Sequence, residues 1–109
     1  MKFQDKVVLI TGSGTGIGMT VAKKFVENGA SVIILGRRRE PLETTSKMLQ
    51  EIINEKNTNA FVRIFSGFDV SDEKAVTDMF DALQNEKIDV DIVVNNAGVS
   101  GPVTSFAHA

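Results

Sequence analysis

The chain alternates short apolar runs with segments of helical periodicity, and this alternation restricts its fold more than any other feature. Four apolar runs predict strands, at Val7–Ile10, Val32–Leu35, Phe61–Phe65 and Val90–Val94. The charge of Arg63 within the third run suits an edge strand better than a central one. Between these runs, apolar residues recur every three or four positions, as they do in helices that cover a sheet. Strands that alternate with helices favour a parallel sheet with helices packed on both faces.

The helix boundaries are marked by capping and turn residues. The first helical stripe starts at Ile17 and stops at Asn28-Gly29, and Pro41 suits the first turn of the second helix. Ser71 or Asp69 is expected to cap the third helix. Right-handed crossovers then predict an α/β fold, a Rossmann-like doubly wound parallel sheet of strand order 3-2-1-4.

The composition excludes several classes of protein. A net charge of −2 gives no basic field for nucleic acid or an anionic membrane. The absence of cysteine and the presence of one histidine, His108, argue against thiol chemistry and a metal site. No apolar run approaches the roughly 20 residues of a membrane span. The first fold-like segment begins within six residues of Met1, and we expect a cytoplasmic protein.

A glycine-rich loop follows the first strand and reads Thr11-Gly12-Ser13-Gly14-Thr15-Gly16-Ile17-Gly18. It is not a Walker loop, because no lysine follows its last glycines and the nearest one is Lys23. The ordinary G-x-G-x-x-G fingerprint also fails, because Ile17 stands where the third glycine would be.

The spacing that fits is T-G-x-x-x-G-x-G, which resembles the loop of the short-chain dehydrogenase/reductase family. The resemblance implies that Gly12 makes the turn after the strand and Gly16 lets the backbone approach a pyrophosphate at the helix N-terminus. It also implies that Gly18 permits close packing of helix and sheet. The alternative is a flexible turn that binds nothing.

Two further motifs carry the same resemblance. The stretch Asn95-Asn96-Ala97-Gly98 follows the fourth strand, and Asp69-Val70 follows the third. In the family the asparagines brace the sheet, and the aspartate accepts a hydrogen bond from the adenine amino group. The alternatives are an Asn-rich turn and a helix cap. The resemblance and the strand ends together predict a cofactor site made of Gly12, Ser13, Gly14, Thr15, Gly16, Ile17, Gly18, Arg37, Arg38, Asp69, Val70, Asn95, Ala97 and Gly98.

The end of the second strand bears on which cofactor is bound. Folds that bind NAD usually place an acid there for the ribose 2′-hydroxyl, but this position is Gly36 and is followed by Arg37 and Arg38. Arginine offers a bidentate, permanently charged partner for a 2′-phosphate, so the sequence favours NADP(H) over NAD(H). Glu40 is a rival ligand for NAD, and Thr15 stands where many NADP-preferring relatives carry a basic residue. The arginines could instead be a solvated helix start.

The catalytic part of the family pattern is absent. The resemblance implies hydride transfer between NADP(H) and a carbonyl or alcohol, with a Y-x-x-x-K pair well after the fourth strand and a homo-oligomeric protein. The sequence has no tyrosine, Ser100 and Ser105 come too early to be the family serine, and His108 has no partner motif. We assign no catalytic residue and no metal ligand.

We therefore expect residues 1–109 to be a truncated NAD(P)-binding domain, the amino-terminal half of a single-domain enzyme, and to be inactive alone. A fourth strand left at the edge would expose apolar surface and favour self-association. Two alternatives stay open: a dinucleotide-binding module without turnover, and a fragment that associates through that edge.

Overall fold

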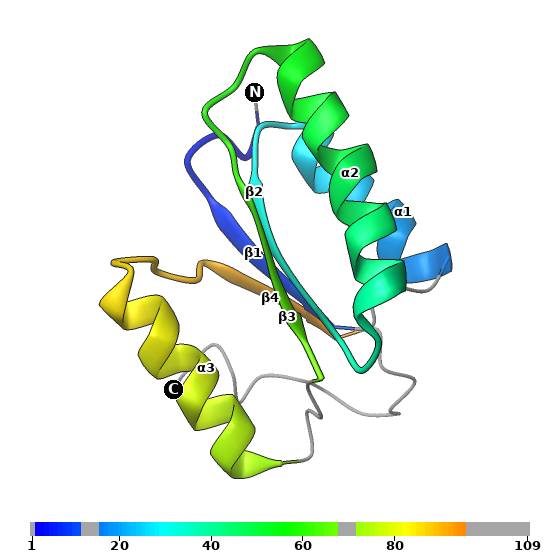
Figure 1. Ribbon diagram of the computed structural model, residues 1–109. Helices are drawn as coiled ribbons and strands as arrows, with labels where there is room; N and C mark the ends of the chain where they lie inside the picture. The colour runs from blue at the N-terminus through cyan, green and yellow to red at the C-terminus, as the bar shows by residue number, and fades with distance from the viewer. Residues whose placement is uncertain (1, 12–15, 68–71, 96–109) are drawn as a thin grey trace.

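The computed structural model describes residues 2–11, 16–67 and 72–95, and they form a parallel sheet with helices on both faces (Figure 1). In chain order the elements are β1 (Val7–Thr11), α1 (Gly16–Glu27), β2 (Ser31–Gly36), α2 (Arg39–Lys56), β3 (Val62–Ser66), α3 (Glu73–Asn85) and β4 (Ile92–Asn95). The strand order is β3-β2-β1-β4, which confirms the sequence prediction. Every described pairing is parallel.

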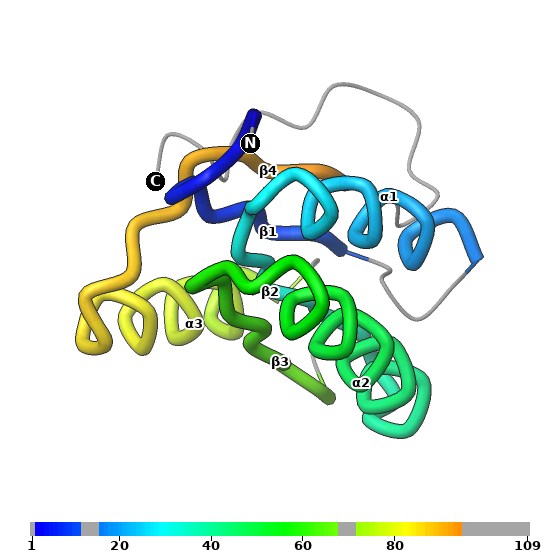
Figure 2. The backbone as a smooth tube through the Cα atoms, turned by 90° about the horizontal axis from the view of Figure 1, so that it is seen from above, coloured from blue at the N-terminus to red at the C-terminus, as the bar shows by residue number. Residues whose placement is uncertain are grey.

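The two faces of the sheet carry separate hydrophobic clusters. Helices α1 and α2 lie on one face, and α3 lies on the other (Figure 2). Alternate residues of a strand point to opposite faces, so Val32 and Ile34 pack under α1 and α2 while Ile33 and Leu35 pack under α3. All four are buried, as expected of a central strand that is covered on both sides.

The predicted boundaries hold within one or two residues, but the predicted cap of the third helix is wrong. The N-cap of α3 is Asp72, whose Oδ1 accepts hydrogen bonds from the backbone N–H groups of Lys74 at 3.0 Å and Ala75 at 3.3 Å. Asp69 and Ser71, the residues expected to cap, lie outside the described residues. Asp72 takes the role because it directly precedes the first helical residue, from where its carboxylate reaches the free N–H groups of the first turn.

Strand β3 lies at one edge of the described sheet, as the charge of Arg63 suggested. The Arg63 guanidinium forms a bidentate ion pair with Glu86 at the end of α3, with Nε 3.0 Å from Oε1. Its Cζ also lies 5.1 Å from the centroid of the Phe65 ring. The hydrogen bond to Arg63 lowers the pKa of Glu86, and the same bond raises the pKa of Arg63. The pair ties α3 to the edge strand.

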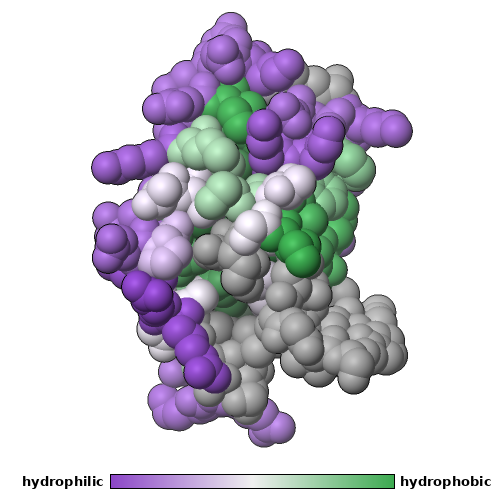
Figure 3. All heavy atoms as spheres, turned by 90° about the vertical axis from the view of Figure 1, so that its right-hand side faces the viewer, coloured by the Kyte–Doolittle hydropathy of each residue, from purple (hydrophilic) through white to green (hydrophobic). Residues whose placement is uncertain are grey.

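Strand β4 forms the other edge of the described sheet, where it pairs with β1. Ile92, Val93 and Val94 are half-buried there. Apolar side chains also reach the surface on the side where α1 and α2 lie (Figure 3). Within the described ranges, no helix combines the length and the apolar character that crossing a bilayer requires.

Candidate functional site

The carboxyl ends of the strands meet at one edge of the sheet. Thr11, the last residue of β1, is in register with Leu35 on β2 and with Asn95 on β4. One position further on, Gly36 is in register with Ser66 on β3. The chain order reverses between β1 and β4, and ligands of such sheets bind outside the carboxyl ends at that reversal. This edge is therefore the candidate site.

Helix α1 begins at this edge with Gly16 and has the features of an anion site. Its first turn contains no acidic residue, so the positive end of the helix dipole is not neutralised there. A Cβ added at Gly16 would meet no described atom within 4 Å, so the space beside this backbone is open. A helix N-terminus beside such a space is suited to bind a phosphate group.

The two residues that follow Gly16 point in different directions. Gly18 is buried and shares its stripe with Ala22 and Val26, which places the small residue where the helix packs on the sheet. Ile17 is 72% exposed and is the large hydrophobic residue that stands out into solvent in the described chain. An apolar side chain next to an anion site is suited to pack against a bound organic ligand.

The end of β2 brings no carboxylate to the edge. A Cβ built on Gly36 would lie 3.3 Å from Cδ2 of the buried Leu42 in α2. The position follows the alternation of Val32 and Ile34, so a side chain there would project on the face that carries α1 and α2. An acid at residue 36 would thus lie on the same side of the sheet as α1.

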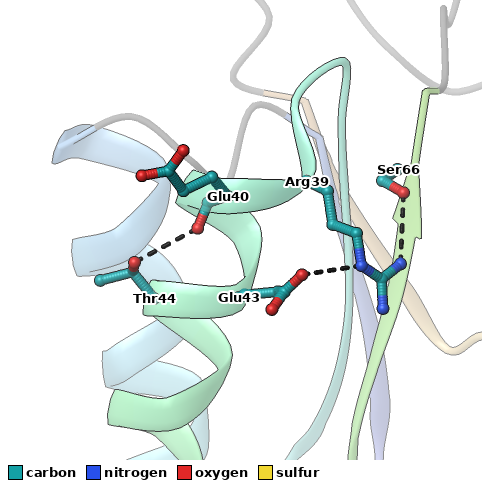
Figure 4. A network of polar contacts seen from close by, with 5 residues as sticks. All are labelled: Arg39, Glu40, Glu43, Thr44 and Ser66. Carbon is teal, nitrogen blue, oxygen red and sulfur yellow. Dashed lines mark hydrogen bonds and ion pairs between the residues drawn. The ribbon is translucent and has the colours of Figure 1, made fainter.

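The three arginines after β2 differ in their surroundings. Arg37 and Arg38 are exposed, and the carbonyl of Arg37 accepts a hydrogen bond from the Gly67 N–H at 3.2 Å. Arg38 is the N-cap residue of α2 in an extended conformation, and it makes no side-chain capping bond. Arg39 is engaged elsewhere: its Nε lies 2.7 Å from Glu43 Oε1, and its Nη1 lies 3.4 Å from Ser66 Oγ (Figure 4). Arg39 thus fits the alternative of an ordinary helix start, as the sequence reading allowed for some of the three.

Several predicted site residues lie outside the described residues: Gly12, Ser13, Gly14, Thr15, Asp69, Val70, Ala97 and Gly98. Of the predicted set, the described backbone includes Gly16, Ile17, Gly18, Arg37, Arg38 and Asn95. Their strand ends and the start of α1 belong to one edge of the sheet. Whether they bind a nucleotide is the subject of the proposal below.

Sequence reasoning missed Ser66 and Gly67, which lie at the end of β3 on this edge. Ser66 accepts the hydrogen bond from Arg39, and Gly67 adopts a φ of 68° and bonds to the β2–α2 turn. Glycine suits that left-handed conformation, which L side chains rarely adopt. The signal was the Ser-Gly pair directly after the third apolar run, which is typical of a turn at a strand end.

A parallel sheet with an acid-free helix start at its switch point is typical of dinucleotide-binding α/β proteins. A family model described as short chain dehydrogenase matches residues 6–109. The chain belongs to this family, as its glycine spacing indicated.

Named relatives agree with this assignment. The chain is 37% identical over 106 residues to a 3alpha-hydroxysteroid dehydrogenase of Mediterraneibacter gnavus, and the match covers 97% of this chain and 40% of that protein. It is 37% identical over 99 residues to an NADP-dependent (R)-specific alcohol dehydrogenase of Lentilactobacillus kefiri, covering 91% of this chain and 36% of that protein. The crystal structure of an NAD+-bound xylitol dehydrogenase superposes with a TM-score of 0.78 at 32% identity, covering 93% of this chain and 36% of that one. The chain thus spans less than half the length of these proteins.

Proposed function

We propose that the whole protein is an NADP(H)-dependent oxidoreductase that transfers a hydride between the nicotinamide and a carbonyl or alcohol substrate. In this proposal the chain supplies the cofactor-binding half. The observation that carries it is the juxtaposition of the acid-free start of α1 with the carboxyl ends of β1, β2 and β4. The family to which the chain belongs adds the reaction type, since relatives are named dehydrogenases.

Different residues of the chain would bind different parts of the cofactor along this edge. The backbone around Gly16 would bind the pyrophosphate, and Ile17 would pack against the dinucleotide. Arg37 and Arg38 would bind the 2′-phosphate of the adenosine ribose. When bound, the nicotinamide supplies the hydride chemistry, and this chain's role is to orient the cofactor.

The preference for NADP(H) rests on the end of β2. Relatives are named for either cofactor, one as NADP-dependent and another as NAD+-bound, so the family alone does not decide. Here the strand ends in Gly36, and two exposed arginines follow. A charge-assisted hydrogen bond contributes about 1.5–3 kcal/mol, which corresponds to a preference of about 10- to 150-fold.

One observation opposes this preference. The carboxylate of Glu40 leaves the first turn of α2 away from Ser66, toward the side on which α1 is drawn (Figure 4). A carboxylate on that side is a candidate partner for the ribose hydroxyls of NAD(H), as the sequence reading also noted. The proposal therefore needs a direct comparison of the two cofactors.

The experiment is a calorimetric titration of the purified protein with NADPH and with NADH at low salt. We expect tighter binding of NADPH. Arg37→Gln and Arg38→Gln should each weaken the binding of NADPH by about 10-fold or more and leave the affinity for NADH nearly unchanged. Arg39→Gln is the matched control, because its guanidinium already pairs with Glu43, and it should change neither affinity by more than about twofold. Equal affinities, or tighter NADH, would contradict the NADP(H) assignment.

A dinucleotide-binding module without turnover is the second candidate, because the described edge is suited to hold a cofactor whether or not a reaction follows. The whole protein, rather than residues 1–109 alone, mixed with NADPH and a panel of ketones separates the two. Oxidation of NADPH that depends on the ketone supports an enzyme, whereas binding with no oxidation supports the module. We assign no catalytic residue to this chain and expect no turnover from it alone.

A further inference from the structure

The first turn of α2 carries three charged residues, and their side chains are not equivalent. Arg39 lies with its Nε 2.7 Å from Glu43 Oε1, one helical turn later, and its Nη1 3.4 Å from Ser66 Oγ on β3. Figure 4 shows the guanidinium between Glu43 on α2 and Ser66 on β3, and the Glu40 carboxylate on the opposite side of the first turn of the helix. The third arginine of the run is thereby turned toward the edge strand.

One further contact joins the ends of β2 and β3. The Gly67 N–H bonds to the carbonyl of Arg37 at 3.2 Å, so the turn after β3 is joined to the turn after β2. The backbone bond fixes the turn, and Arg39 and Ser66 add a side-chain link across the same gap. The direction of the Arg39 side chain thus depends on Glu43 and Ser66 rather than on the backbone alone.

We propose that Glu43 is a specificity-determining residue, because its pairing with Arg39 keeps that guanidinium at the end of β3 and away from the cofactor ribose. This inference rests on the proposed function. The charge beside a bound 2′-phosphate is then set by Arg37, Arg38 and Glu40. Removing the Glu43 carboxylate releases Arg39, whose long flexible side chain can turn toward the phosphate.

The expected change is modest because the pair is exposed. The Arg39 and Glu43 side chains are 66% and 50% exposed, and a pair of this kind spaced four residues apart biases the side chain by about twofold. Releasing Arg39 toward the phosphate gains at most the free energy of that pair, so NADPH should bind about twofold more tightly at low salt. NADH lacks the 2′-phosphate and should respond by less than about 1.5-fold.

The experiment is a titration of the protein and its Glu43→Gln variant with NADPH and NADH at low salt. We expect the ratio of the two affinities to move toward NADPH by about twofold. The control is the same substitution made in an Arg39→Gln background. If Glu43 acts through Arg39, the second substitution has no further effect there, whereas a through-space effect of the lost carboxylate persists. Ser66→Ala, which removes the weaker contact, should shift the ratio in the same direction by less.

The outcomes separate this inference from the function on which it rests. If the parent protein binds neither nucleotide, the proposed function fails and this inference fails with it. Two results overturn the inference alone, provided that the parent binds NADPH. In the first, Glu43→Gln leaves the ratio of the NADPH and NADH affinities unchanged. In the second, Glu43→Gln shifts this ratio as much in the Arg39→Gln background as in the parent. Circular dichroism of each variant verifies that the fold is retained, which is expected for exchanges at exposed positions.

Discussion

Replacing Gly36 by aspartate should reverse the cofactor preference, because it restores the acid that NAD-binding folds carry at the end of β2. The structure sets the steric cost. The new Cβ would lie 3.3 Å from Leu42 Cδ2 and 3.4 Å from Cδ1, which is tighter than an ordinary contact. Leu42 is fully buried, so its side chain has to shift by a few tenths of an ångström. Mild overpacking of this kind costs about 1 kcal/mol of folding free energy.

The electrostatic cost falls on NADPH. A carboxylate at residue 36 would face the 2′-phosphate across a few ångströms near the protein surface. At the effective dielectric of such a position, like charges repel by about 1–3 kcal/mol after screening. This corresponds to a loss of roughly 5- to 150-fold in NADPH affinity. NADH should bind more tightly, because the carboxylate accepts hydrogen bonds from the ribose hydroxyls.

Fluorescence titrations of the Gly36→Asp and Gly36→Ala variants with both nucleotides test this reasoning. The alanine variant carries the same Cβ without the charge, so it isolates the contact with Leu42. We expect Gly36→Ala to keep the parent's preference and Gly36→Asp to reverse it. If both variants lose the same factor in NADPH affinity, the effect is steric and the electrostatic reasoning is refuted.

Two predictions concern stability. Asp72→Ala should destabilise the protein by about 0.5–2 kcal/mol in urea unfolding, because it removes the acceptor for two N–H groups of the first turn of α3. The matched change Asp78→Ala loses only an exposed ion pair to Lys74 and should cost less than about 0.5 kcal/mol; equal losses would contradict the capping role. The Arg63–Glu86 pair predicts a pH dependence, since the folded-state pKa of Glu86 is lowered by the hydrogen bond from Arg63. The stabilisation from this pair is present above the ordinary pKa of the carboxylate and is lost as the pH falls through the lowered pKa. Glu86→Gln should therefore remove that part of the acid sensitivity. If the urea midpoint depends on pH in the same way for the parent and the variant, this reasoning is contradicted.

The strand order and the layers could be predicted from the sequence because they depend on patterns that repeat. Buried β-branched runs that alternate with amphipathic helices leave few arrangements of a parallel sheet, and right-handed crossovers then determine the order. The charge of Arg63 within the third run was enough to place that strand at an edge. The position of the candidate site follows from the same topology.

Details that depend on contacts between distant residues could not be predicted. Three residues able to cap a helix, Asp69, Ser71 and Asp72, stand close together in the sequence, and the one chosen depends on where the first turn begins. Met79 and Leu83 of this helix pack against sheet residues that lie far away in the sequence. The bond from Arg39 to Ser66 likewise joins residues 27 positions apart, and it requires the register of β2 with β3.

The central claim is that a dinucleotide binds at the carboxyl edge of the sheet, against the start of α1. The most direct measurement is to map the backbone amide NMR shifts of the labelled protein as NADPH is added. The account predicts saturable shifts at Thr11, Gly16 to Gly18 and Arg37, and none at the opposite ends of the strands, around Ser31 and Asp91. Saturable shifts confined to those opposite ends, or no shifts at millimolar NADPH, would contradict it.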